Sequence, residues 1–209
     1  RGHGGSEGRE RLRWLRIADY VADVATVAAT LPVAPILIGH SMGGLVAQKY
    51  LERHPAPAAV LLASVPTAGA TGAALRVLRH HPVQFAKINA RLSLYPVVET
   101  VALAHEYLFS PTTPPERVAA VQPQLQDESY RAFLDMMTSL PRPKRVAAPV
   151  LVLGAADDGI FAPREVEATA RAYHTAATLY PGMGHNLMLD AGWERVAADI
   201  VAWLTARGL

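Results

Sequence analysis

The 209-residue sequence contains no cysteine. Disulfide bonds, zinc sites built from thiolates and catalytic thiols are therefore excluded. Long apolar runs are missing too, since the longest, "AAVLLASV", is far shorter than the roughly 20 residues that a membrane-spanning helix requires. No positively charged segment followed by an apolar stretch indicates a secretory leader. We therefore expect no transmembrane segment and a cytoplasmic location.

A strong excess of one charge is also lacking. The formal net charge is +2, from 20 Lys and Arg against 18 Asp and Glu. The arginines near the start of the chain alternate with Glu7 and Glu10, as on a solvated surface, and do not form a basic patch. We expect no nucleic-acid partner. Since 51% of the residues are hydrophobic, the chain is able to bury a substantial core, and its length suits one domain with an insertion.

Four short apolar segments predict β-strands. They are "PILIG", "AAVLLASVP" (58–66), "PVLVLG" (149–154) and "ATLY". Helical patterns precede, separate or follow these segments, at 17–31, 45–54, 163–175 and 193–208. Continuous apolar strands that alternate with helices indicate a parallel sheet covered on both faces. The predicted fold class is therefore α/β, with about four strands.

Residues 67–147 have a different sequence pattern. Short helical patterns alternate there with prolines, and no segment predicts a strand. We interpret this region as a helical lid inserted between the second and third predicted strands. The sheet and its covering helices then come from residues 1–66 and 148–209.

The most informative motif is Gly39-His40-Ser41-Met42-Gly43, followed by Gly44. It has the form Gly-x-Ser-x-Gly and joins a predicted strand to a predicted helix. In such an elbow the serine sits on a strained turn, and small neighbours let strand and helix approach each other. We predict that Ser41 is a nucleophile and that the N–H of Met42 helps to hold the developing oxyanion.

A serine hydroxyl needs a base, and the order along this kind of fold is serine, acid, histidine. His185, on a Gly-rich loop after the last predicted strand, is the candidate base. His40 is a poorer candidate, because adjacent side chains at an elbow point apart. The acid is expected after "LVLG", where Asp157 and Asp158 are both available. The other histidines form no metal-binding pattern, so we predict neither a metal nor a cofactor.

The chain resembles serine hydrolases of the α/β-hydrolase superfamily, above all the monoacylglycerol lipases and lysophospholipase-like esterases. Four stretches carry the resemblance: "RGHGGSEG", "GHSMGG", "GAADDGIFAP" and "GMGHNLM". In that family an aliphatic residue follows the acid by two positions, with a proline beyond, which favours Asp158 because of Ile160 and Pro163. Pro163 comes one residue later than in many members, so Asp157 remains the alternative.

The resemblance also places the opening stretch. "RGHGGSEG" is similar to the family's loop after its fourth strand, which makes His3 and Ser6 structural loop residues. The four predicted strands would then correspond to the family's fifth to eighth. We therefore expect this chain to be the C-terminal part of a longer protein, with a core incomplete at its N-terminus. The second oxyanion donor would lie in the preceding part.

The resemblance implies hydrolysis of carboxylic esters through an acyl-enzyme, with a small-molecule ester that carries an apolar acyl group as the substrate. A monoacylglycerol or a lysophospholipid is favoured. Large residues of the predicted lid would form its core, and a few would line an acyl pocket: Phe85, Tyr95, Tyr107, Phe109, Tyr130, Phe133, Met136 and Met137. The alternatives are C–C bond hydrolysis, amide hydrolysis, cofactor-free haloperoxidase chemistry, and a truncated module without catalysis.

Overall fold

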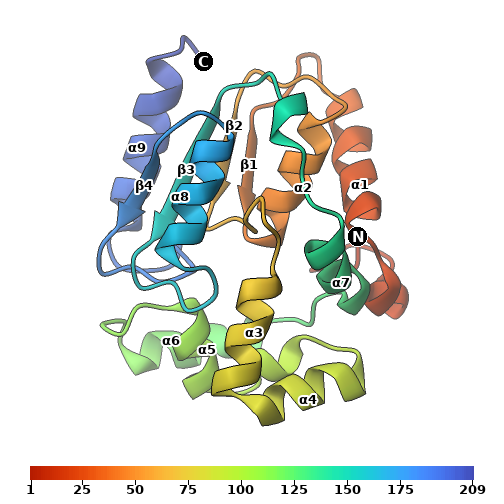
Figure 1. Ribbon diagram of the computed structural model, residues 1–209, viewed down its shortest axis with the longest axis vertical. Coiled ribbons are helices and arrows are strands. Elements are labelled where there is room, and N and C mark those ends of the chain that lie inside the picture. The colour runs from red at the N-terminus through yellow and green to blue at the C-terminus, as the bar shows by residue number, and fades with distance from the viewer.

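Figure 1 shows the computed structural model, which describes residues 1–209. Four parallel strands form one sheet in the order β1-β2-β3-β4, so that neighbours in the chain are neighbours in the sheet. The strands are β1 (Leu37–His40), β2 (Ala59–Leu62), β3 (Val150–Ala155) and β4 (Ala177–Tyr180). The predicted α/β class and parallel sheet are confirmed.

Helices cover both faces of the sheet (Figure 1). They are α1 (Ile17–Ala29), α2 (Met42–Leu51), α8 (Pro163–Ala172) and α9 (Trp193–Thr205). Leu61 and Val152 face α2 and α8, whereas Val60 and Leu153 face the side that α9 covers. Helices α2 and α8 share one face because consecutive right-handed crossovers in one direction place their helices on the same side.

Between β2 and β3 the chain forms helices only. They are α3 (Thr71–His80), α4 (Pro82–Arg91), η2 (Tyr95–Val97), α5 (Val101–Leu108), α6 (Pro115–Val121), η3 (Gln122–Gln124), α7 (Tyr130–Thr138) and η4 (Pro143–Arg145), while η1 (Arg9–Trp14) precedes α1. Helices α3 to α6 lie beyond the carboxyl ends of the strands (Figure 1). Helix α7 instead packs its Ala132 and Met136 in one cluster with Ile17 and Leu45 of α1 and α2.

We call residues 67–147 the insertion, and its action as a lid stays a prediction. Local capping explains where several of its helices begin. Thr100 accepts a hydrogen bond from the N–H of Leu103 before α5, and Ser129 accepts one from Ala132 before α7. Pro82 and Pro115 each occupy the first turn of a helix, where a missing N–H costs nothing.

Strand β2 is shorter than the nine residues predicted for it. Ala63 has φ 39°, a left-handed value that ends the extended conformation. Beyond it, the N–H of Val65 donates to the carbonyl of Ser41 at 3.1 Å and not to a neighbouring strand. The chain that leaves β2 therefore passes directly behind the turn that carries Ser41.

Candidate active site

Ser41 occupies the turn between β1 and α2 with φ 50° and ψ −120°, a conformation that residues with a side chain rarely adopt. Its N–H donates to the carbonyl of Leu62 at 3.0 Å. Its own carbonyl accepts from the N–H of Gly44 at 3.0 Å and from that of Val65. Several backbone hydrogen bonds thus hold the strained turn that the sequence motif predicts.

Two glycines allow close packing at this turn, Gly39 of β1 against α2 and Gly44 of α2 against the chain that leaves β2. A Cβ atom on Gly39 would lie 2.5 Å from the carbonyl oxygen of Gly43, and one on Gly44 would lie 2.2 Å from Ser64 Oγ. Gly43 is different, because it is exposed and a Cβ atom there would meet nothing within 4 Å. The need for close approach therefore explains Gly39 and Gly44 but not Gly43.

His185 lies on the loop after β4, and its ring faces the carboxylate of Asp158. Nδ1 of His185 is 3.0 Å from Oδ2 and 3.1 Å from Oδ1 of Asp158. Both side chains are almost wholly buried, at 2% and 0% exposure. The N–H groups of Ile160 and Phe161 donate to Oδ1 of Asp158 at 2.7 and 2.9 Å, which fixes the carboxylate in its loop.

The neighbouring carboxylate takes no part in this arrangement. Asp157 is exposed, and its backbone N–H donates to the carbonyl of Met183 at 3.0 Å. The two adjacent side chains diverge, as expected from their positions. The structure therefore brings Asp158, and not Asp157, to His185.

Ser41 and His185 line the same cavity, but no hydrogen bond joins Ser41 Oγ to His185 Nε2. Such hydrogen bonds are often long in enzymes without substrate and shorten in the complex. Met42 is the first residue of α2, and the N–H groups in the first turn of a helix have no partner inside it. Its position next to Ser41 suits an oxyanion contact.

His40 lies against His185, which the sequence did not indicate. The ring centroids are 4.7 Å apart, and Nε2–H of His40 donates to the backbone carbonyl of His185 at 3.0 Å. Burial, together with the nearby His185 ring, lowers the pKa of His40 to about 4. His40 is therefore neutral at pH 7 and binds the loop that carries His185.

The cavity has a volume of about 370 Å³, and 18 of the 26 residues that line it are hydrophobic. It extends from Ser41 and His185 into the insertion. Five of the eight large insertion residues singled out in the sequence line it: Phe85, Tyr95, Tyr107, Phe133 and Met136. The other three do not, and Phe109 instead packs in a small cluster with Ala104 and Val118.

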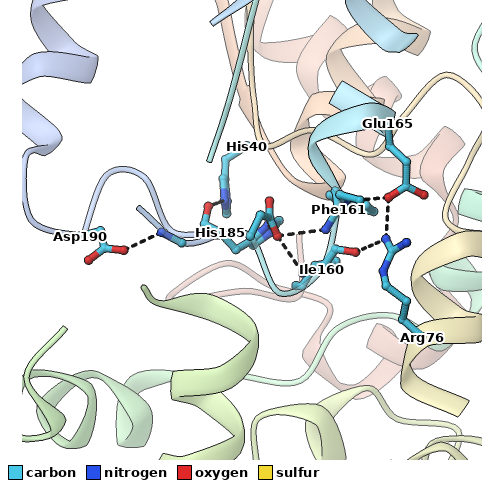
Figure 2. A network of polar contacts seen from close by, with 10 residues as sticks. His40, Arg76, Ile160, Phe161, Glu165, His185 and Asp190 are labelled. Atoms are coloured by element: carbon cyan, nitrogen blue, oxygen red, sulfur yellow. Dashed lines mark hydrogen bonds and ion pairs between the residues drawn. The ribbon is translucent and has the colours of Figure 1, made fainter. Parts of the chain in front are cut away.

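The insertion also contacts the loop of Asp158. Arg76 on α3 donates to Glu165 Oε2 at 2.6 Å and makes a further hydrogen bond to the carbonyl of Ile160 (Figure 2). The N–H of Ile160 in turn donates to Asp158. Helix α3 is thus connected to the carboxylate through a single loop residue.

Comparison with known proteins identifies the family of this chain. A family model described as serine aminopeptidase, S33 matches residues 1–192. The chain belongs to the S33 family. It is 26% identical to a monoacylglycerol lipase of Mycolicibacterium smegmatis over 225 residues, which cover 99% of this chain and 76% of the lipase.

Two solved structures have the same fold as this S33 family member. One is BpoC of Mycobacterium tuberculosis, assigned as a non-heme bromoperoxidase, with a TM-score of 0.72 and 25% identity over 99% of this chain and 79% of that one. The other is a monoacylglycerol lipase of Paleococcus ferrophilus, with a TM-score of 0.69 and 24% identity over 99% and 80% of the two chains. The fold is therefore that of the α/β-hydrolases, and the chain is a member of their serine hydrolases, as the motifs predicted.

Sequence reasoning missed one buried carboxylate of this S33 member. Asp190, five positions beyond His185, is wholly buried and accepts hydrogen bonds from both the insertion and the His185 loop. A single acidic residue after "NLML" gives no periodic or motif signal, so only the tertiary structure reveals it. No group of three or more His, Asp or Glu side chains is placed to hold a metal, and none of the helices combines the length and apolar character needed to cross a bilayer.

Proposed function

We propose that this S33 family member hydrolyses carboxylic esters through an acyl-enzyme formed on Ser41. His185 removes the hydroxyl proton as Ser41 attacks the carbonyl carbon, and then donates it to the leaving alcohol. Asp158 orients the imidazole and stabilises its cation. The N–H of Met42 stabilises the oxyanion, and water releases the acid in a second cycle of the same steps.

One observation carries this proposal: His185, buried and paired with Asp158, lines the same cavity as a serine on a strained strand–helix turn. A buried histidine that is hydrogen-bonded to a carboxylate and lies beside a serine in a cavity is the arrangement that nucleophilic catalysis needs. Structural roles alone would not explain why the serine keeps an unfavourable backbone conformation.

The cavity supports a substrate with a long apolar acyl group. Its lining is mostly hydrophobic, its volume lies in the usual range for small-molecule sites, and only a few polar residues interrupt it, among them Gln126 and Asn186. The two similar proteins that are named monoacylglycerol lipases point the same way. We therefore favour a monoacylglycerol or a similar lipid monoester.

The test is covalent labelling by a fluorophosphonate. We expect labelling of the wild-type protein at Ser41 and hydrolysis of p-nitrophenyl esters with a preference for longer acyl chains. Ser41→Ala should abolish both, since Ser41 is the only serine, threonine or lysine among the residues that line the cavity. Labelling or hydrolysis that persists in Ser41→Ala would overturn the proposal.

A panel of substrates separates this function from the other chemistries of the fold. The panel contains an aminoacyl p-nitroanilide, a C–C bond substrate and a peroxide-dependent bromination assay, the last because of the similarity to BpoC. Faster Ser41-dependent turnover of any of these than of esters would redirect the assignment within the same catalytic machinery.

A further inference from the structure

The carboxylate of Asp190 lies between the His185 loop and the insertion, and five hydrogen bonds satisfy it. Oδ2 accepts from the N–H of Gly184 at 2.7 Å and from that of Ser110 at 2.9 Å. Oδ1 accepts from Thr113 Oγ1 at 2.6 Å, from the N–H of Ala191 at 3.0 Å and from Ser110 Oγ at 3.2 Å. The residue is 0% exposed.

The charge of this carboxylate is stable in spite of its burial. Desolvation would raise the pKa of Asp190, but the hydrogen bonds from Thr113, Gly184, Ser110 and Ala191 together outweigh it and lower the pKa. A carboxylate that accepts several N–H and O–H groups is a strong, geometrically fixed connection.

Two more contacts join the same two segments. The N–H of Asn186 donates to the carbonyl of Leu108 at 2.8 Å, on the other side of His185 from Gly184. A Cβ atom on Gly184 would lie only 2.3 Å from the backbone of Phe109, so this position admits no side chain. The backbone is therefore hydrogen-bonded to Leu108 on one side of His185 and packs closely against Phe109 on the other.

We propose that Asp190 is a positioning residue for His185. It fixes the loop that carries His185 relative to residues 108–113 of the insertion; this inference rests on the proposed function. Figure 2 shows Asp190 and Arg76 on opposite sides of His185. Asp190 does not line the cavity, so it acts through the loop and not on the substrate. The insertion then fixes the base as well as the walls of the cavity.

The test compares Asp190→Ala and Asp190→Asn with the wild-type protein. In Asp190→Asn the amide oxygen can accept from Gly184 and Ser110, while its NH₂ donates to the rotatable hydroxyls of Thr113 and Ser110. Only the N–H of Ala191 then loses its partner. Asp190→Ala removes every one of these acceptors. We expect kcat per titrated active site to fall about 100-fold in Asp190→Ala and about fivefold in Asp190→Asn, with KM little changed, because a displaced base affects the chemical step.

Hydrogen exchange provides a readout that needs no activity. In Asp190→Ala, exchange should become faster in 108–113 and in 181–191 together, and remain unchanged in β2 and β3. The matched control is Asp199→Ala, since Asp199 accepts a hydrogen bond from Tyr180 on the far side of the sheet. That variant should lose stability but keep the wild-type kcat.

A folded Asp190→Ala with kcat within about threefold of wild type, or with faster exchange in only one segment, would overturn the proposal. If Asp190→Ala does not fold, Asp190→Asn decides, and an unchanged kcat there overturns the proposal equally. Failure of the proposed function would look different, because hydrolysis would persist in Ser41→Ala. The exchange experiment would still test whether Asp190 connects the His185 loop to residues 108–113.

Discussion

At the scale of single residues, adjacent carboxylates differ sharply in environment. Asp158 is buried against His185, and Asp157 faces solvent. We expect Asp158→Asn to lower kcat by about 10⁴, as loss of the orienting acid does in other triads, because the amide no longer stabilises the imidazolium. Asp157→Asn should change kcat by less than about threefold. Steady-state kinetics with a p-nitrophenyl ester compares the two, and the reverse ranking would assign the acid to Asp157.

The environment of His40 predicts how the stability of the protein depends on pH. Its pKa is lowered from 6.5 to about 4 by burial and by the nearby His185, so between these values the unfolded chain binds the proton more strongly. The free energy of unfolding should therefore fall as the pH decreases through this window. His40→Gln keeps an N–H donor for the carbonyl of His185 but does not titrate.

The contribution of His40 is measured by urea unfolding of both proteins at pH 7 and pH 4.5. Between these pH values wild type should lose about 2 kcal/mol more than His40→Gln, since one pKa unit corresponds to about 1.4 kcal/mol. Equal losses would mean that His40 titrates normally. His3, whose pKa is raised by its hydrogen bond with Glu128, acts in the opposite direction in both proteins and cancels in the difference.

The candidate residues could be proposed from the sequence because each belongs to a local pattern. Ser41 follows from a five-residue motif, and His185 follows from its place after the last predicted strand. The place after "LVLG" left Asp157 and Asp158 open, and only the family resemblance favoured Asp158. Contacts between distant segments left no such signal. His40 against His185 and Asp190 against Ser110 depend on how loops meet in space, and no periodicity along the chain records that.

At the scale of elements, the contact between α2 and the chain that leaves β2 depends on glycine at position 44 and not at position 43. A Cβ atom on Gly44 would collide with Ser64, whereas Gly43 faces open space. Gly44→Ala should destabilise the protein by about 2 kcal/mol or more, as overpacking at a rigid contact does. Gly43→Ala should be neutral or stabilising by up to about 1 kcal/mol, because alanine favours the helix. Thermal unfolding of both variants checks this, and equal effects would show that the turn relaxes.

The sequence predicted which strands and helices exist better than it predicted their lengths and packing. The strands are continuous apolar runs, so their existence was clear. Their lengths were not, because β2 ends where Ala63 takes up a left-handed conformation that serves the Ser41 turn. The packing of α7 against α1 was also not predictable, since the apolar face of a short helix fits the insertion or the sheet domain equally well.

At the scale of the whole molecule, β1 is one of the two edge strands of the sheet. This strand pairs only with β2, and Ile38 is 57% exposed on it. A free edge carries unpaired N–H and C=O groups, and an exposed apolar side chain adds an attractive surface. The 209-residue chain, expressed by itself, is therefore expected to associate through β1 as its concentration rises.

Ile38→Lys should suppress this association, because a charge on an edge strand opposes pairing with a second edge. The matched control is Val201→Lys, which introduces the same charge at a position on α9 that is 62% exposed and lies away from the sheet edge. Light scattering over a concentration series should show the average mass of Ile38→Lys approaching the 22.4 kDa of a single chain, while Val201→Lys behaves as wild type. An equal reduction in both variants would assign the effect to net charge, and a wild-type chain that stays monomeric throughout would show that the β1 edge does not drive association.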